Sequence, residues 1–237
     1  MTTAGTSRGR IDKRQAILDA AFAVFANRGY EQACVQEIAN EAGVAKPTVY
    51  NHLNDKATLF RHAIEAAADA VAAECLDAVQ RLREPGDNVR AATTNVAYQL
   101  LKVCSSQRAR ALRTLTYAQA RYFPDLIDTV HDRTSRQLAD ALADRLARWT
   151  LAGWIRPCDP ALAAEQLLAL LTGPMEHRSG AGTRKVPRAD IRRIADAAVD
   201  TFFRAYSNND EIHRMINNTS DPLSLSGVPD QIEADSG

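Results

Sequence analysis

The chain has 237 residues, of which 46% are hydrophobic, and its 29 basic side chains are balanced by 29 acidic ones. This hydrophobic content excludes wholesale disorder, and the length suits one or two domains. The zero net charge argues against a nucleic-acid partner, which usually requires a basic surface. The sequence holds 42 alanines but only 11 glycines and 9 prolines. Since alanine is the strongest helix former, we expect an all-α fold.

The sequence does not indicate membrane insertion, secretion or a metal site. No apolar run approaches the roughly 18 residues of a membrane span, and the N-terminal segment MTTAGTSRGRIDKR has no apolar signal core. The four cysteines are far apart and form no CxxC pair, which argues against a disulfide framework and against a zinc site: Cys34, Cys75, Cys104 and Cys158. We therefore expect a cytoplasmic protein with no membrane contact, no metal and no cofactor.

Residues 1–10 predict a flexible basic arm, and helical periodicity begins at Ile11. Gly29 is expected to end this first helix in the left-handed conformation that is common at helix C-termini. Apolar residues spaced by one, three and four positions form a stripe on one face of the helix: Ile17, Leu18, Ala21, Val24 and Phe25.

Two short helices are predicted next, over residues 35–42 and 46–53, with a turn at Gly43 between them. Pro47 falls in the first turn of the second helix, where its missing N–H costs little. Asp55 is a suitable N-cap for a long alanine-rich helix that follows and runs to about residue 83.

Five further helices are predicted in the remainder of the chain. Asp159 and Pro160 form a cap and first-turn pair that begins the fourth of these helices. A loop rich in glycine and proline is expected over residues 173–187, and residues 208–237 predict an acidic, mostly disordered tail. The helices are expected over residues 87–105, 107–120, 124–152, 159–173 and 188–207.

Two short helices joined by a tight glycine turn form a helix-turn-helix, whose second helix lies in the major groove of DNA. Val49 and Leu53 lie four positions apart and are expected to face the core. The remaining side chains of the second helix are mostly hydrogen-bonding types, as base and phosphate contacts require: Lys46, Thr48, Tyr50, Asn51 and His52.

The residues from Ile11 to Phe60 resemble the N-terminal domain of TetR-family (TetR/AcrR-like) transcriptional regulators. The matching motifs occur in the family's order and spacing: Ile38-Ala39, Ala42-Gly43-Val44, Thr48-Val49-Tyr50, His52-Leu53, Lys56 and Leu59-Phe60. The segments RYFPDL and DPALAAEQLLALLTG resemble the ligand-binding domain of many members more loosely. The resemblance implies about nine helices, with a three-helix DNA-binding domain over residues 11–60 and a ligand-binding and dimerisation domain over residues 61–207.

The resemblance also implies which residues contact DNA. Thr48, Tyr50, His52 and Lys56 are expected to bind phosphates, and Lys46 and Gln36 are expected to reach base edges. Pro47 and Asn51 complete the expected DNA-contacting set.

Cys34 and Ala45 stand where most members have a serine or threonine cap. A missing cap typically costs about 1 kcal/mol, so we expect weaker helix ends and one or two fewer phosphate contacts.

The C-terminal helices are expected to enclose an effector cavity and to form a dimer interface, as in the family. For the cavity the open alternative is an ordinary core, and Arg113 and Arg121 either bind a ligand carboxylate or form a solvated face. The expected cavity residues are Leu100, Val103, Cys104, Tyr117, Tyr122, Phe123 and Trp149. The expected dimer-interface residues are Leu167, Leu170, Leu171, Ile191, Ile194, Ala198 and Phe202.

The sequence thus predicts a homodimeric transcriptional regulator, a repressor that a small, mainly apolar effector releases from a palindromic operator in double-stranded DNA. Two alternatives stay open: a helical interaction module of the same fold without operator binding, and a helical-bundle enzyme. No catalytic residue is predicted, because the five histidines lack metal-ligand spacing and no nucleophile or phosphate-binding motif occurs.

The zero net charge is an average of two unequal parts. Residues 208–237 hold six acidic side chains and one basic one, whereas residues 1–207 hold 28 basic and 23 acidic side chains. We therefore expect DNA binding to depend on placed hydroxyls, amides and a few cations.

Overall fold

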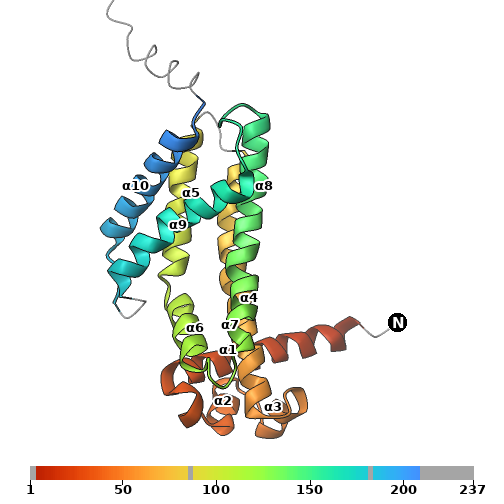
Figure 1. Cartoon of the computed structure of the whole chain (residues 1–237). Coiled ribbons are helices and arrows are strands. Elements are labelled where there is room, and N and C mark those ends of the chain that lie inside the picture. The colour runs from red at the N-terminus through yellow and green to blue at the C-terminus, as the bar shows by residue number, and fades with distance from the viewer. Residues whose placement is uncertain (1–3, 85–87, 181–183, 209–237) are drawn as a thin grey trace, which may run out of the picture.

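The computed structural model describes residues 4–84, 88–180 and 184–208, without the side chains of residues 4–12 and of His52. Apart from an isolated β-bridge between Ile155 and Ser207, the regular structure in this part of the chain is helical, as predicted (Figure 1). The helices are α1 (Ala4–Gln32), α2 (Val35–Glu41), α3 (Lys46–His52), α4 (Lys56–Gln80), η1 (Arg81–Arg83), α5 (Val89–Cys104), α6 (Gln107–Ala118), α7 (Asp125–His131), η2 (Asp132–Arg136), α8 (Gln137–Leu151), α9 (Pro160–Ser179) and α10 (Arg188–Tyr206).

The first helix differs from the prediction at both ends. It begins at Ala4, so residues 4–10 of the expected arm are helical; this segment holds no proline that would prevent added turns. Gly29 has the expected positive φ of 75°, but its ψ of 167° places it in an extended region that only glycine adopts readily. The chain therefore kinks at Gly29 instead of ending the helix with a left-handed cap.

One hydrophobic core joins the two short helices to the rest of the molecule. It includes the buried stripe of α1 together with Val49 and Leu53, which confirms that these two residues face inward. The same core continues through the first half of α4 and into α6, α7 and the segment between them, where Leu112, Leu126 and Phe123 belong to it. Helix α2 packs against α1 and α3, and α1 in turn packs against α4 and α6.

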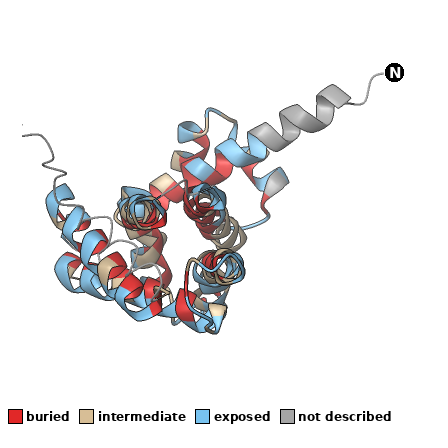
Figure 2. Ribbon diagram, turned by 90° about the horizontal axis from the view of Figure 1, so that it is seen from above, coloured by how far each residue is buried: buried red, intermediate tan, exposed pale blue. Residues whose placement is uncertain are grey.

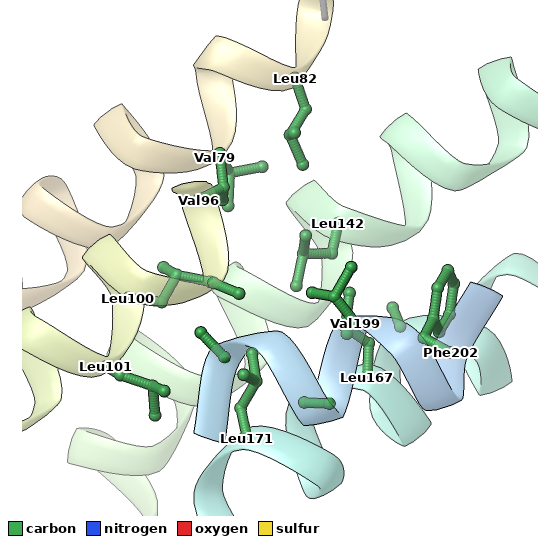
Figure 3. Close-up of a cluster of buried hydrophobic side chains, with 14 of the residues drawn as sticks. Val79, Leu82, Val96, Leu100, Leu101, Leu142, Leu167, Leu171, Val199 and Phe202 are labelled. Atoms are coloured by element: carbon green, nitrogen blue, oxygen red, sulfur yellow. The ribbon is translucent and has the colours of Figure 1, made fainter. Parts of the chain in front are cut away.

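A second core lies at the other end of α4 and is formed by α4, α5, α8, α9 and α10. Seen from above, the buried residues of these helices face the interior of the bundle (Figure 2). In the close-up of this cluster, Leu167 of α9 lies beside Val199 of α10, and Leu171 lies further along α9 (Figure 3).

The residues expected at the dimer interface are corrected by this packing. Six of the seven are at most 3% exposed within a single protomer, and Leu170 is half-buried against the same core. Side chains covered this completely have no surface left for a second copy. The six are Leu167, Leu171, Ile191, Ile194, Ala198 and Phe202.

Helix α9 runs further than expected, to Ser179, although Pro174 lies within it. An interior proline costs about 3 kcal/mol in a helix, yet Met175 and Ser179 are buried on the face that also carries Leu171. Burial of this face offsets the proline, and Gly180 ends the helix with a φ of 54°.

The structure divides one predicted helix into three segments and does not describe the predicted tail. The single helix expected over residues 124–152 is present as α7, the π-helical segment η2 and α8, which follow one another without a break. The predicted acidic tail, from residue 209 onward, lies outside the described residues, as do residues 1–3 of the expected arm.

Candidate nucleic-acid interface and effector cavity

The turn between α2 and α3 has the hydrogen bonds of a Schellman motif. The Val44 N–H donates to the Ala39 carbonyl at 2.9 Å, and the Gly43 N–H donates to the Asn40 carbonyl at 3.1 Å. Gly43 has a φ of +65°, a conformation that L side chains rarely adopt. The turn thus fixes the direction in which α3 leaves α2.

Helix α3 presents one polar face to solvent. Lys46, Pro47, Tyr50 and Asn51 are exposed, Tyr50 by 41%, and the Lys46 ammonium group lies 6.0 Å from the Tyr50 ring centre. Thr48 is half-buried. The backbone of His52 ends α3, and its side chain is outside the described part of the structure.

On α2, Gln36 is exposed, and its side-chain amide donates a hydrogen bond of 3.0 Å to the side-chain oxygen Oδ1 of Asn40. Asn40 is exposed as well and was absent from the expected set. Its spacing of four from Gln36 is the sequence signal that indicates a shared helix face.

The helix caps follow the sequence prediction. Cys34 and Ala45 precede α2 and α3, and neither side chain makes a capping hydrogen bond. The exposed Cys34 thiol instead has a lowered pKa, because the backbone N–H groups of Gln36 and Glu37 stabilise its thiolate. Asp55 caps α4 as expected by accepting from the Thr58 N–H at 2.7 Å.

Lys56, the first residue of α4, has partners within the protein. Its ammonium group donates to the Glu31 carbonyl oxygen at 2.9 Å and lies 4.9 Å from the centre of the Tyr30 ring. Burial raises the pKa of the Tyr30 hydroxyl. Lys56 therefore connects the start of α4 to Tyr30 and Glu31, the residues that follow the kink at Gly29.

A cavity of about 570 Å³ lies between α4 and the helices α5 to α9, within the size range of small-molecule sites. Val71, Leu112, Val130 and Leu138 contribute apolar wall, and Arg113 contributes a cation. Polar side chains also line it, among them Thr116, Asp128, His131, Thr134 and Glu176. This combination suits a ligand that is mainly apolar and carries a polar group.

Two of the seven residues expected at the cavity line it, namely Cys104 and Tyr117. The expectation is wrong for Leu100 and Trp149, which are buried in the second core, and for Phe123, which is buried in the first. Tyr122 is 66% exposed, and Val103 packs between the two cores. Large apolar residues fill the contacts between helices, so residue type alone did not separate cavity from core.

The cavity-lining residues that the sequence did not predict recur at helical spacing along two helix faces. One face combines Ile127, His131, Thr134 and Leu138, and another combines Leu168, Thr172 and Glu176. Polar residues at spacings of three and four beside inward-facing leucines are the sequence signal of a cavity wall. Of the two arginines weighed as ligand partners, Arg113 lines the cavity and Arg121 is exposed.

Helix α4 connects the cavity to the helix-turn-helix. Below the cavity, Arg61 of α4 forms a two-bond ion pair with Asp125 of α7, which lowers the pKa of that carboxyl. Arg133 of η2 donates to both oxygens of Asp69 at 2.8 and 2.7 Å. These ion pairs join α7 and η2 to α4.

Aromatic rings close the junction between the helix-turn-helix and the cavity-bearing helices. The Phe60 ring lies 5.0 Å from those of Phe25 and Tyr30, and 5.2 Å from that of Phe123. Rings at these distances pack favourably against one another.

Among the described residues, no group of three or more His, Cys, Asp or Glu side chains is arranged to hold a metal ion. Within the same ranges, no helix combines the length and the apolar character needed to cross a membrane.

Comparison with known proteins places both parts of the chain. Residues 17–63 match the family model described as bacterial regulatory proteins, tetR family, and residues 91–208 match the AefR-like transcriptional repressor, C-terminal domain. The transcriptional activator FasR of Mycolicibacterium smegmatis is 34% identical over 92 residues, which are 37% of this chain and 42% of FasR. The regulator AcrR of Shigella flexneri is 25% identical over 135 residues, 57% of this chain and 61% of AcrR. The chain thus spans less than two thirds of either relative.

Solved structures extend the comparison to most of the chain. A crystal structure from Mesorhizobium loti MAFF303099, assigned to the TetR-family transcriptional regulators, is 30% identical with a TM-score of 0.78 and covers 84% of this chain and 98% of its own. The flavonoid-responsive regulator FrrA shares the fold at 24% identity, with a TM-score of 0.62 over 83% of this chain and 97% of its own. The helix-turn-helix, the helical domain behind it and these matches together show that the chain belongs to the TetR family of transcriptional regulators.

Proposed function

We propose that the protein is a homodimeric repressor that binds a palindromic operator through α2 and α3, and that it is not an enzyme. The observation that carries this proposal is the polar face of α3, held outward by the Schellman turn and by buried Val49 and Leu53. Lys46 at the start of α3 is placed for guanine edges, and Tyr50 for a phosphate. Thr48, Asn51, His52 and Lys56, with Gln36 and Pro47, complete the proposed contact set.

The effector proposal rests on the cavity. A mainly apolar molecule with an acidic group would contact the leucine and valine walls and pair with Arg113. Since α4, α7 and η2 line the cavity and are tied by ion pairs, a ligand that favours one arrangement of these helices shifts the position of the helix-turn-helix.

The dimer proposal uses the exposed faces of α9 and α10. Ala169 and Gly173 of α9 and Ala197 and Thr201 of α10 are exposed small residues that allow close helix approach, and Leu162 is 49% exposed. A two-fold dimer would present two α3 helices to half-sites about 34–36 Å apart, or multiples of that distance.

The deciding experiment is fluorescence anisotropy with a palindromic fragment from upstream of the protein's own gene and with a random duplex of equal length. We expect Lys46→Ala to weaken operator binding by about 5- to 100-fold and Tyr50→Phe to weaken it as well. The control Lys102→Ala removes an exposed lysine of α5 and should leave binding unchanged.

If the wild-type protein binds both duplexes equally, operator binding is refuted and the interaction-module alternative takes its place. If the two α3 variants bind like the control, the assignment of the contacts to α3 is refuted.

A further inference from the structure

The positive charge of the protein is concentrated in two stretches of the chain. Residues 88–124, which contain α5 and α6, hold six basic side chains and no acidic one. Residues 184–193, which lead into α10 and form its first turns, hold five basic side chains and one acidic one. Since residues 1–207 hold 28 basic and 23 acidic side chains in all, the remainder of this part of the chain is acidic on balance.

Helices α5 and α10 lie side by side (Figure 1), and cations from both meet at one aromatic ring. The Arg192 guanidinium lies 4.5 Å from the centre of the Tyr98 ring, and the Lys102 ammonium group lies 5.9 Å from the same centre. Arg188 precedes Arg192 by one helical turn and therefore shares its face of α10. We call the following exposed cations the basic patch: Lys102, Arg184, Lys185, Arg188 and Arg192.

The acidic side chains of α10 do not neutralise the basic patch. Asp190 pairs with Arg193, and Asp200 pairs with Arg204, so both carboxylates are bound to arginines outside the patch. Asp196 is exposed one turn after the last cation of the patch. Within the described residues, no cation of the patch forms an ion pair. Like charges held close together repel one another, so the patch favours an anionic partner.

The basic patch lies outside the face of α10 that we propose for dimerisation. Arg192 points toward α5, where it contacts the Tyr98 ring. Ala197 follows five positions later, so the two side chains point about 140° apart around the helix axis. A dimer formed through Ala197 therefore leaves the patch open to another partner.

The acidic tail of the same chain is an anion that is tethered close to the basic patch. Residues 209–237 hold six acidic side chains and one basic one, and three of the carboxylates fall within six positions, namely Asp230, Glu233 and Asp235. The tail follows α10, and the rise of a helix places Arg192 about 21 Å from Tyr206. The 23 residues between Tyr206 and Asp230 span at most about 75 Å, so the acidic residues reach the patch, and the tether raises their local concentration there.

We propose that residues 230–235 of the tail bind the basic patch of their own chain and thereby keep it from binding the phosphates of DNA outside the operator. Fixed cations attract phosphates whatever the base sequence, and tail carboxylates compete for the same cations. Since the paired groups are exposed, salt weakens the contact. The effect on DNA rests on the DNA binding proposed above, whereas the contact between tail and patch does not.

Crosslinking of the full chain with a water-soluble carbodiimide tests the contact, because this reagent joins a carboxylate to an amine without a spacer. Trypsin releases residues 215–237 as one peptide, since no lysine or arginine follows Arg214. We expect mass spectrometry to find this peptide joined to Lys102 or Lys185, with a much lower yield in about 1 M salt. Lys13 and Lys46 are exposed lysines outside the patch and serve as controls.

Two variants and a labelling experiment locate the contact. Arg192→Ala should lower the yield of the joined peptides by about two- to fivefold, as the loss of one exposed ion pair predicts. Arg193→Ala removes the neighbouring exposed arginine, which pairs with Asp190, and should leave the yield unchanged. In a mixture of isotope-labelled and unlabelled chains, both halves of a joined peptide should carry the same label, because tail and patch belong to one chain.

Any of four results would overturn the proposed contact: no tail peptide joined to Lys102 or Lys185, a tail peptide joined mainly to Lys13 or Lys46, joined peptides that combine both labels, or a yield that neither salt nor Arg192→Ala lowers. These readouts do not involve DNA, so they stand or fall separately from operator binding.

The effect on DNA is measured by fluorescence anisotropy with a random duplex at low salt. We expect the triple variant Asp230→Asn, Glu233→Gln and Asp235→Asn to bind this duplex about threefold or more tightly than the wild type does. Adding Arg192→Ala and Lys102→Ala to the triple variant should remove the gain. Equal affinities of the triple variant and the wild type would refute the competition between the tail and DNA.

Discussion

Lys56 combines an internal role with the phosphate contact proposed for it. Its ammonium group is bound to the Glu31 carbonyl and lies over the Tyr30 ring, so it stabilises the corner that leads into α2. Neighbouring Asp55 begins α4 through its bonds to Thr58. The sequence predicted the Asp55 cap because the signal is local, whereas the bond from Lys56 to residue 31 spans 25 positions and depends on the kink at Gly29.

Replacing Lys56 by methionine separates its two roles. We expect the free energy of unfolding to fall by about 1 kcal/mol through loss of the hydrogen bond, measured by urea denaturation. We expect the slope of log K against log salt for operator binding to fall by about one as well. The comparison variant Lys46→Met should weaken operator binding without lowering stability, and an unchanged slope in Lys56→Met would limit Lys56 to its structural role.

Asp55 predicts a pH dependence of stability. The Thr58 N–H and hydroxyl lower its pKa, so the folded protein binds this proton less readily than the unfolded chain does. Its contribution is therefore complete above the unfolded pKa of roughly 4 and is lost as the pH falls through the lower folded value. Thermal melts between pH 7 and pH 3 should show a smaller acid-induced decrease for Asp55→Ala than for wild type, and equal decreases would contradict the assignment.

At the scale of single elements, the chain uses the same turn twice. Gly153 follows α8 with a φ of +74°, and the bonds from Trp154 to Trp149 and from Gly153 to Thr150 repeat the pattern around Gly43. Glycine marks both places in the sequence, and the turn at Gly43 could be predicted from it. The end of α9 could not be predicted, because burial of Met175 and Ser179 against distant helices outweighs the local effect of Pro174.

The two turns provide a matched pair of variants. Gly43→Ala and Gly153→Ala each force a Cβ into a positive φ, and we expect each to cost about 1 kcal/mol of stability. Neither site has an atom within 4 Å of the added Cβ, so sterics do not distinguish them. Gly43→Ala should also weaken operator binding in anisotropy, because Gly43 directs α3, whereas a similar loss in Gly153→Ala would mean that the effect arises from stability alone.

At the scale of the whole molecule, two cores share α4, and the C-terminal residues serve different contacts from those predicted. The amphipathic patterns of α9 and α10 identified apolar faces correctly, but these faces pack within the protomer and not between protomers. An amphipathic sequence pattern shows that one face of a helix is buried, but it does not show which helix, or which protomer, covers that face. The same limit explains why Leu100, Phe123 and Trp149 were expected at the cavity and are found in the cores.

The dimer proposal predicts that charge on the exposed face of α10 dissociates the protein. For Ala197→Arg we expect light scattering to give the mass of one 25.9 kDa chain at concentrations where the wild type gives twice that mass. Ala73→Arg places the same charge at an exposed alanine of α4 and should leave the dimer intact. A dimeric Ala197→Arg protein would exclude this face from the interface.

The cavity proposal predicts that filling the space blocks binding. Leu168→Trp adds volume at the cavity wall, whereas Leu170→Trp changes an equally half-buried leucine of α9 that does not line the cavity. With the apolar anion 1-anilinonaphthalene-8-sulfonate as probe, we expect Leu168→Trp to raise the Kd by about tenfold or more. Equal affinities of the two variants, measured by fluorescence titration, would place the probe elsewhere.

The aromatic group of Phe25, Tyr30, Phe60 and Phe123 has a consequence for engineering. Phe123 comes from the segment between α6 and α7, so a fragment cut after residue 60 would leave the rings of Tyr30 and Phe60 without this partner. We therefore expect that the DNA-binding segment, residues 11–60, does not fold well when it is separated from the rest of the chain. A chimera that joins this segment to another effector domain must also contain matching residues of α6 and α7. Without them, the segment lacks the apolar surface against which it packs.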